Sequence, residues 1–303
     1  MAEETKLRHA LTKPPVRVGV AGWSYPDWEG IVYPKVRRFD GLSYLTAFFD
    51  TLEVNSSFYR IPAARTTSSW ARRASGNAEF RFTLKLFKGF THERTAAEAE
   101  ERSFRDALRP LEEADVLGAL LLQFPWSFKN EPESRSHLSA TLDRFARFPL
   151  VVEVRHASWN QPEFYEFLAG QGVGFCNIDQ PLIGRSLGPS EHATGPVGYV
   201  RLHGRNYRDW FREDAGRDAR YDYLYNEKEL DPWMEKISEI RDSASSTFVV
   251  ANNHFRGQAV VNALQIRSRI EKRRVPAPGS LLEHYPVLEK SAVAEKPPQA
   301  RLF

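Results

Sequence analysis

The sequence predicts an α/β protein built as a single (β/α)8 barrel, and three observations lead to that fold. Eight short apolar runs recur about 33 residues apart on average, which is close to the length of one strand–helix unit. Helical patterns separate most of these runs. The turn GxGxxG, which a doubly wound open sheet usually carries after its first strand, is absent. We therefore expect a TIM-like barrel, with the open sheet as the alternative.

Runs of β-branched and apolar residues mark the eight expected strands. They lie at 18–22, 52–58, 80–86, 118–124, 150–155, 174–179, 198–204 and 247–253. Helix-forming residues predict helices in most of the intervals between them, and a last helix after the eighth strand. These helices lie at 62–76, 95–113, 134–148, 161–171, 229–244 and 257–274. Pro62 supports the first of them, because proline suits the first turn of a helix.

Two intervals depart from the strand–helix alternation. Residues 180–196 are rich in Gly, Pro and Ser and lack helical periodicity, so we expect one outer helix to be missing between strands six and seven. Residues 205–231 are aromatic and charged, which predicts an extended loop over the barrel mouth. We expect an N-terminal extension at 1–15, the barrel at 16–274, and a tail at 275–303 that is poorly ordered or draped on the barrel.

Composition and charge limit the classes of function. The chain has 303 residues, with 42 Lys and Arg against 39 Asp and Glu, and Cys176 is its one cysteine. The basic surplus lies at the two ends, and a neutral body argues against a broad nucleic-acid footprint. No apolar run approaches the ~20 residues of a membrane helix. The first residues hold no hydrophobic stretch, so we expect a cytoplasmic protein without a secretory signal or a membrane partner.

Polar and charged side chains stand near the carboxyl ends of the expected strands. Six strands carry a pair of them, and the fourth strand ends in Gln123. The pairs are Glu53 and Asn55, Thr83 and Lys85, Glu153 and Arg155, Asn177 and Asp179, Arg201 and His203, and Asn252 and Asn253. The carboxyl ends of barrel strands meet at one mouth, so these side chains predict a pocket there. The alternative is a buried network of paired charges that only fixes strand register, which desolvation would make costly.

Seven ordered motifs resemble the YecE-like family, also called domain of unknown function 72. They are GWSYPDWEGIVYP (22–34), LEVNSSFYRIP (52–62), FRFTLKLFKGFTH (80–92), LLLQFPWSF (120–128), VVEVRHASW (151–159), YVRLHGR (199–205) and NNHFRGQAVVNALQI (252–266). The resemblance spans about residues 17–267 and implies a TIM-like barrel, but no particular reaction. It marks as motif positions Glu53, Lys85, Gln123, Glu153, Arg155, His156, Trp159, Arg201, His203, Gly204, Asn252, Asn253 and His254.

The residue types at the expected mouth indicate acid–base chemistry on a small anion. Glu53 and Glu153 lie three strands apart in the ring and would face each other, as a general acid and a general base do. With His203 they form the expected catalytic set. The basic side chains would bind a phosphate or a carboxylate, unless they only pair with the acidic ones. The expected substrate-binding set is Lys85, Gln123, Arg155, His156, Trp159, Arg201, Asn252 and Asn253.

We expect no cofactor and no metal at this site. No HxH or HExxH spacing occurs, and Arg155 and Arg201 would repel a cation. Nucleophilic catalysis is not indicated either, because GxSxG is absent and Cys176 lies in the middle of an apolar strand. We expect a phosphate or sulfate ion near Arg155 and Arg201, unless Glu153 and Asp179 saturate both guanidiniums.

Three functions stay open at this point. The first is an enzyme of hydrolase or lyase type, acting by general acid–base chemistry on a small phosphorylated or carboxylated substrate. The second is a ligand-binding barrel without catalysis. The third is a nucleic-acid processing or binding protein, which would add a set of surface arginines to the mouth cations. That set is Arg60, Arg65, Arg72 and Arg73. The sequence indicates no oligomeric state.

Overall fold

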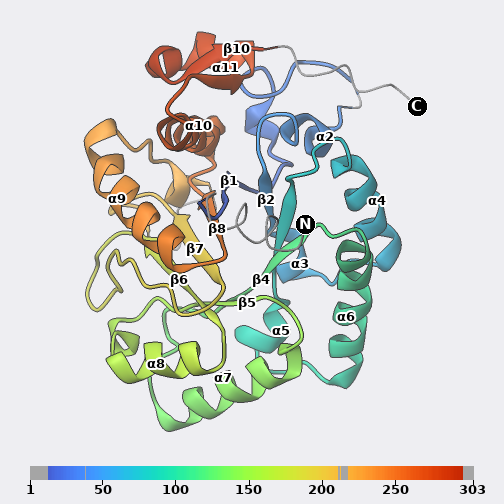
Figure 1. Ribbon diagram of the computed structural model, residues 1–303, viewed down its shortest axis with the longest axis vertical. Coiled ribbons are helices and arrows are strands. Elements are labelled where there is room, and N and C mark those ends of the chain that lie inside the picture. Colours follow the sequence, from blue (N-terminus) through green and yellow to red (C-terminus); the bar gives the residue numbers. More distant parts are fainter. Residues whose placement is uncertain (1–12, 38, 211, 213–217, 296–303) are drawn as a thin grey trace, which may run out of the picture.

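Eight parallel strands follow one another around a closed barrel (Figure 1). The computed structural model describes residues 13–37, 39–210, 212 and 218–295. The strands are β1 (Val16–Ala21), β2 (Thr51–Val54), β3 (Arg81–Lys85), β4 (Leu117–Gln123), β5 (Leu150–Glu153), β6 (Gly174–Asp179), β7 (Val197–Leu202) and β8 (Ser246–Ala251). Because β1 pairs with both β2 and β8, the sheet has no free edge. The predicted (β/α)8 barrel is confirmed.

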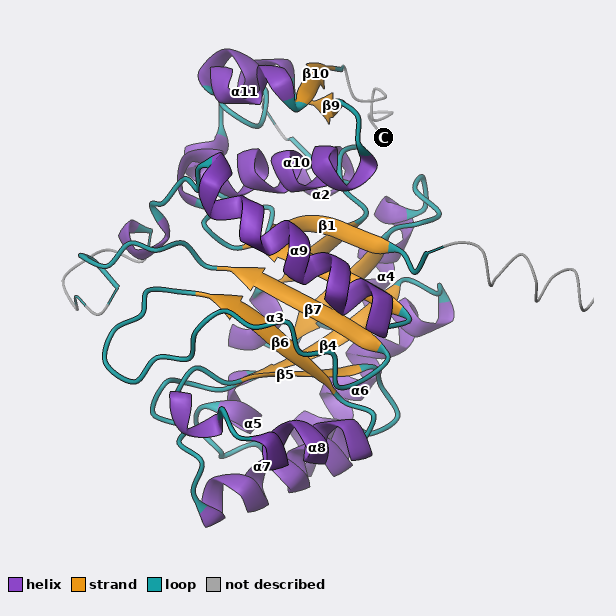
Figure 2. Ribbon diagram, turned by 60° about the vertical axis from the view of Figure 1, so that its left-hand side comes forward, coloured by secondary structure: helices purple, strands orange, loops and turns teal. Residues whose placement is uncertain are grey.

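Helices surround the tilted strands (Figure 2). They are α2 (Gly41–Leu45), α3 (Ser56–Tyr59), α4 (Ala64–Ala74), α5 (Lys88–Thr91), α6 (Glu98–Glu113), α7 (Pro132–Phe145), α8 (Pro162–Gly170), α9 (Glu227–Ser243) and α10 (Gln258–Glu271). Six of them correspond to the expected helices, with ends that differ by a few residues. Residues 180–196 contain no helix, which confirms that one outer helix is missing between β6 and β7.

Strand burial follows from this arrangement. Every residue of β2, β5, β6 and β7 is buried, because one face of each strand lies under helices or loops and the other fills the barrel. Inside the barrel, the rings of Tyr199 and Phe248 lie with centroids 6.0 Å apart. At Gly19 of β1, an added Cβ would lie 1.8 Å from the backbone oxygen of Thr51. Only glycine therefore allows β1 to approach β2 this closely.

The extended loop expected at 205–231 is shorter, because α9 begins at Glu227, and residues 211 and 213–217 of this stretch lie outside the described residues. Among its described residues the regular structure is a 3₁₀ turn, η3 (Ala219–Tyr221), and the start of α9. Asn226 caps α9, since its side chain accepts a hydrogen bond from the backbone N–H of Glu229. This cap explains why α9 begins two residues before the expected helix. The segment thus brings Tyr221 to the barrel mouth.

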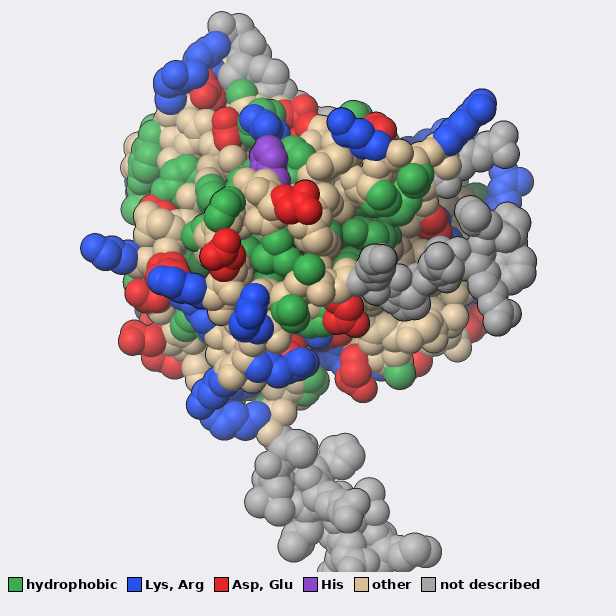
Figure 3. Space-filling view, turned by 90° about the horizontal axis from the view of Figure 1, so that it is seen from above, with side chains coloured by type: hydrophobic (Ala, Val, Ile, Leu, Met, Phe, Trp, Pro, Cys, Tyr) green, Lys and Arg blue, Asp and Glu red, His purple; other side chains and the backbone are tan. Residues whose placement is uncertain are grey.

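Residues 275–295 have regular structure and lie against α10. They form β9 (Val275–Ala277), α11 (Gly279–His284), the 3₁₀ helix η5 (Pro286–Lys290) and β10 (Ala292–Ala294). Leu281 and Leu288 are fully buried, so this part of the expected tail is draped on the barrel rather than poorly ordered. Residues 296–303 lie outside the described residues, as do residues 1–12 of the expected N-terminal extension. Figure 3 looks onto this end of the molecule, where acidic and basic side chains are interspersed with apolar ones.

Within residues 13–295, apart from the short undescribed gaps, no helix is long and apolar enough to cross a bilayer.

Candidate active site

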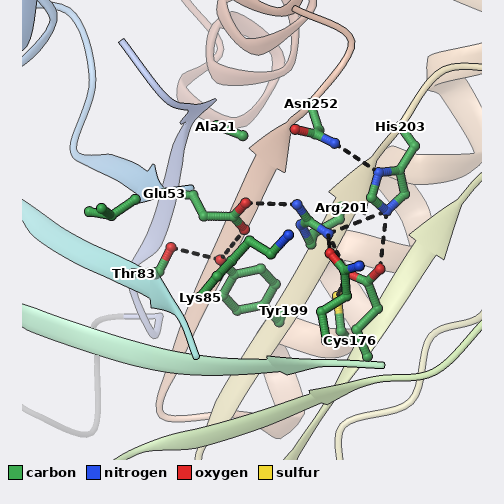
Figure 4. Close-up of polar contacts among 12 residues, drawn as sticks. Ala21, Glu53, Thr83, Lys85, Cys176, Tyr199, Arg201, His203 and Asn252 are labelled. Atoms are coloured by element: carbon green, nitrogen blue, oxygen red, sulfur yellow. Dashed lines mark hydrogen bonds and ion pairs between the residues drawn. The ribbon is translucent and has the colours of Figure 1, made fainter. Parts of the chain in front are cut away.

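A buried ion-pair network crosses the barrel interior at the carboxyl ends of the strands (Figure 4). Nη2 of Arg201, on β7, lies 2.7 Å from Oε1 of Glu53 on β2. Nη1 of the same guanidinium pairs with Oε2 of Glu153 on β5. Nε of Arg155 lies 2.9 Å from the other oxygen of Glu153. The side chains of Arg201, Glu53 and Glu153 are at most 1% exposed, so solvent screens these pairs little.

Both carboxylates are fully occupied within this network. The second oxygen of Glu53 lies 3.0 Å from the Tyr199 hydroxyl. Burial alone would raise the pKa of Glu153, but the Arg201 and Arg155 guanidiniums hold this pKa well below its usual range. Glu53 thus pairs with Arg201, and Glu153 pairs with Arg201 and Arg155. The catalytic role expected for the two carboxylates stays a prediction.

His203 lies behind Arg155 and is fully buried. Nδ2 of Asn252 donates to its Nδ1 at 3.0 Å. In the tautomer that this contact implies, Nε2 carries the hydrogen and faces Oε1 of Glu153 at 3.5 Å. Burial, together with the charges of Arg155 and Arg201, lowers the pKa of His203 to about 3. At neutral pH the imidazole is therefore uncharged, and the catalytic role expected for His203 stays a prediction.

Lys85, at the end of β3, differs from the other cations of the cluster. Among the described residues its amine has no hydrogen-bond or ion-pair partner, and no dashed line reaches it in Figure 4. Its Nζ lies 4.2 Å from the centroid of the Phe58 ring. Burial lowers the pKa of Lys85 to about 7, and the charge of Arg201 adds to the effect. Lys85 is therefore partly neutral near physiological pH.

A cavity of about 240 Å³ borders this cluster. It is lined by Tyr25, Asn55, Phe58, Tyr59, Lys85, His92, Gln123, Arg155, Arg201, Tyr221, Asn252 and His254. An adjoining cavity of about 220 Å³ shares four of these residues and extends toward Trp126 and Trp210. The structure therefore brings five of the eight expected substrate-binding residues to one cavity: Lys85, Gln123, Arg155, Arg201 and Asn252.

Some residues that line the cavities carried no sequence signal for the site. His92 lies directly after α5 and lines both cavities. Burial, together with the charge of Lys85, lowers its pKa to about 4. Tyr25 and Tyr221 carried no signal beyond their place in loops that follow β1 and β7. Only the long loop itself, predicted to cover the mouth, could have indicated Tyr221.

Three expected substrate-binding residues are not among those that line this cavity. Nδ2 of Asn253 donates to the backbone oxygen of Tyr223 at 2.7 Å and to Asn262 of α10 at 2.8 Å. Adjacent residues of an extended chain point to opposite sides, so Asn252 and Asn253 cannot both face the mouth. His156 instead accepts a hydrogen bond from the backbone N–H of Ser158.

The third of these residues, Trp159, lies in the outer layer of the barrel. Its Nε1 donates to the backbone oxygen of Phe128 at 2.7 Å, and the two rings stack. Trp159 lines a different and larger cavity, of about 570 Å³, beside α7 and α8. That cavity is remote from the ion-pair network, and we assign it no part in the chemistry.

Asp179 was expected at the mouth as a competitor for the arginines, and this expectation is wrong. It accepts hydrogen bonds from Arg205, from the Tyr225 hydroxyl and from Nε1 of Trp233. On β6 the inward face is that of Cys176, whose sulfur lies 3.8 Å from Glu153. Asp179 is three residues further along, so it points outward to α9.

The arrangement also changes the expected anion site. Both Nη atoms of Arg201 pair with Glu53 and Glu153, while its buried Nε has no hydrogen-bond partner among the described residues. Nε of Arg155 pairs with Glu153, and the Arg155 side chain remains 15% exposed at the cavity. An anion bound at the mouth would therefore meet Arg155 and Lys85 rather than Arg155 and Arg201.

Among the residues that the structure describes, no three His, Cys, Asp or Glu side chains are grouped to hold a metal ion. Cys176 is buried, and burial raises the pKa of its thiol well above the usual value.

Comparisons with known proteins agree on one family. The family model described as protein of unknown function DUF72 matches residues 17–282. UPF0759 protein YunF of Bacillus subtilis (strain 168) is 30% identical over 270 residues, which cover 83% of this chain and 93% of that protein. A DUF72 family protein from Thermotoga maritima MSB8, known from a crystal structure, has a TM-score of 0.73 and 32% identity, covering 85% of this chain and 99% of its own.

A second crystal structure, of a DUF72 family protein from Enterococcus faecalis V583, has a TM-score of 0.74 and 26% identity. It covers 84% of this chain and 95% of its own. None of these descriptions names a substrate or a reaction.

Proposed function

The chain belongs to the DUF72 family of proteins of unknown function, and from its own geometry we propose an enzyme that transfers protons on a small anionic substrate, with Lys85 as the acid–base residue. One observation carries this proposal. Lys85 borders the mouth cavity without a hydrogen-bond or ion-pair partner among the described residues, whereas the neighbouring charges are paired. A proton-transfer group needs this freedom and a pKa near the working pH.

The charge balance of the cluster supports the choice of an anion. Glu53 and Glu153 offset Arg201 and Arg155, and His203 is neutral above a pH of about 3. The proton on Lys85 therefore decides whether the mouth is neutral or carries one positive charge. A bound anion favours the protonated amine, and loss of the anion favours the neutral one. Substrate binding and proton transfer are thus coupled at one side chain.

Polar groups at the cavity can position the anion. Nη2 of Arg155 lies 3.4 Å from Nε2 of His203, whereas Nη1 has no partner among the described residues. Charge-assisted bonds from a guanidinium to an anion are strong. Gln123 accepts a hydrogen bond from Arg201 at 3.3 Å through Oε1, which leaves its amide N–H groups for a ligand. At about 30 Å³ per water-sized group, a cavity of about 240 Å³ accommodates about eight such groups. A carboxylate or phosphate on a chain of a few carbons fits this size.

Anion binding is tested by thermal unfolding with acetate and sulfate, whose charges stay constant between pH 6 and pH 9. Both anions should raise the unfolding midpoint more at pH 6 than at pH 9, because Lys85 is charged at the lower pH. A ligand at a hundred times its dissociation constant stabilises by about 2.7 kcal/mol. In Lys85→Met the anions should shift the unfolding midpoint equally at pH 6 and pH 9. Lys88→Met is the matched control, since Lys88 pairs with Glu93.

Proton transfer itself is tested in D2O by proton NMR with malonate and pyruvate. The enzyme should speed the loss of the carbon-bound proton signal, and Lys85→Met should abolish this effect. Anion binding without any exchange would favour the ligand-binding barrel instead. If tens of millimolar of either anion raised the unfolding midpoint of the unaltered protein no more than that of Lys85→Met, the proposal as a whole would be contradicted.

A further inference from the structure

We propose that Lys85 forms an imine with an aldehyde or ketone carbon of the substrate, so that the substrate class is a small carbonyl compound that also carries a carboxylate or a phosphate. This inference rests on the proposed function and deepens it. It turns Lys85 from a group that only moves protons into one that also binds the reacting carbon.

The surroundings of Lys85 are those of a nucleophilic amine. A carboxylate in contact with a lysine keeps the ammonium protonated and unreactive. Here both nearby carboxylates are taken by Arg201, which lies between Glu53 and Glu153. On its other side Lys85 meets the apolar ring of Phe58, which is itself buried. Apolar and cationic neighbours together favour the neutral amine, the form that attacks a carbonyl.

The residues of α3 fix the position of Lys85. The hydroxyl of Ser57 donates to the backbone oxygen of Lys85 at 2.7 Å and also contacts the backbone oxygen of Val54 at 2.9 Å. Ser57 is fully buried, and the next residue, Phe58, supplies the ring beside Nζ. The segment that follows β2 thus holds both the backbone and the tip of Lys85. A held amine loses less freedom when it forms a covalent bond.

The position of Arg155 defines the rest of the substrate. Arg155 and Lys85 line the same cavity of about 240 Å³. A ligand that uses both must carry its anionic group only a few bonds from its carbonyl carbon. Small 2-oxo acids and carbonyl compounds phosphorylated close to the carbonyl meet this condition.

The bond changes balance without an external oxidant or reductant. The nitrogen lone pair of neutral Lys85 forms a bond to the carbonyl carbon, and the C=O π electrons move to oxygen, giving a carbinolamine after proton transfer from nitrogen to oxygen. The hydroxyl then leaves as water with one added proton, while the nitrogen lone pair forms the C=N bond. Amine, carbonyl and one proton thus yield a protonated imine and water. The protonated imine withdraws electrons from the adjacent carbon, which makes its C–H or C–C bond easier to break.

The pH dependence of imine formation follows from the groups that face Lys85. These groups are Glu53 on β2, Glu153 and Arg155 at the end of β5, Arg201 and His203 on and after β7, and His92 of α5. Of these groups, His92 and His203 stay neutral between pH 6 and pH 8, with pKa values of about 4 and 3. Lys85, with a pKa of about 7, titrates within this interval. The neutral fraction, and with it the initial rate, should rise about tenfold from pH 6 to pH 8.

The experiment traps the imine by reduction. The full chain is incubated with glyoxylate, pyruvate or dihydroxyacetone phosphate and excess sodium cyanoborohydride, which reduces C=N to a stable amine. Intact-mass spectrometry counts the adducts, and peptide mapping locates them. We expect one adduct per chain, at Lys85, with at least one probe. Lys85→Arg should lose it and Lys88→Arg should keep it. Which probe reacts shows whether the anion is a carboxylate or a phosphate.

A second measurement does not depend on a variant that folds. Acetate or sulfate, added to the unaltered protein, should protect Lys85 from the probes and leave the surface lysines as reactive as before. Adducts spread over surface lysines and equal in Lys85→Arg would overturn the inference. Stabilisation by anions without any adduct at Lys85 would also overturn it, while the proposed proton transfer would stand. If the anions gave no stabilisation and no adduct formed at Lys85, both the inference and the proposed function would be overturned.

Discussion

Arg201 is the side chain on which the charged cluster depends. It bridges Glu53 and Glu153, which come from strands on different sides of the barrel, and all three side chains are almost completely buried. Removing one partner of a buried ion pair leaves an uncompensated charge in a medium of low dielectric constant, which costs about 3–5 kcal/mol. Substitution of Arg201, at the centre of the network, should therefore destabilise the protein more than substitution of Arg155 at its edge.

Arg201→Met should accordingly lower the free energy of unfolding by about 3–5 kcal/mol, measured by urea denaturation. Arg155→Met should cost clearly less, because Glu153 keeps its contact with Arg201 and Arg155 is partly exposed. Replacing both carboxylates by glutamine in the Arg201→Met background should recover part of the loss. If the two arginine variants lost the same free energy of unfolding, Arg201 would not be the centre of the network.

Lys85 gives the stability of the protein a pH dependence of defined sign. Its pKa is about 7 in the folded state and about 10.4 in an unfolded chain. Between these values the unfolded chain binds more protons, so the contribution of Lys85 to stability rises with pH. Lys85→Met should therefore be stabilised relative to the unaltered protein at pH 6, by a margin that shrinks toward pH 10. Parallel stability curves, like those expected for Lys88→Met, would rule out the lowered pKa.

At the scale of secondary-structure elements, the closure of the barrel depends on the tight pairing of β1 with β2. A Cβ on Gly19 would meet the backbone of Thr51, which cannot rotate away as a side chain can. We expect Gly19→Ala to cost about 3 kcal/mol or more, because the two strands must move apart. Gly76→Ala, where an added Cβ meets no atom within 4 Å, should change stability by about 0.5 kcal/mol or less. Thermal unfolding of both variants compares them, and a tolerated Gly19→Ala would show that β1 can shift.

Local sequence patterns predict where the helices lie, but they do not predict the exact residues at which the helices begin and end. Expected helices such as 161–171 and 257–274 are found close to those positions, as α8 and α10, because apolar periodicity marks the buried face of a helix. The true ends follow from individual hydrogen bonds. The reciprocal bonds between Asn226 and Glu229 start α9, and only the three-dimensional structure shows that both are made.

At the scale of the whole molecule, residues 275–295 complete the fold on the outer side of α10. Leu288 is fully buried, whereas its neighbour Val287 is 45% exposed. Leu288→Ala should lower the free energy of unfolding by about 2–5 kcal/mol, and Val287→Ala should change it little. Denaturant unfolding measures both. If the two variants behaved alike, the segment would not contribute to the cooperative core.

The sequence by itself determined the barrel, the order of its strands, the missing helix between β6 and β7, and the mouth as the place of the site. These follow from local regularities, because strand and helix periods repeat along the chain and parallel strands joined by helices close only in a few ways. It also placed Lys85, Gln123, Arg155, Arg201 and Asn252 at one mouth, since alternation along each strand fixes the inward face.

Only the tertiary structure decided which of the charged groups remain available. Arg201 pairs with Glu53 and Glu153, and Asp179 and Asn253 face outward. Which charged side chains pair depends on distances between strands that are far apart in the chain. Whether a side chain near a strand end faces inward or outward depends on the residue at which the strand ends. Neither the distances nor the strand ends can be read from residue types or spacing. Among the described residues the amine of Lys85 has no ion-pair partner, because Glu53 and Glu153 pair with Arg201 and Arg155 instead.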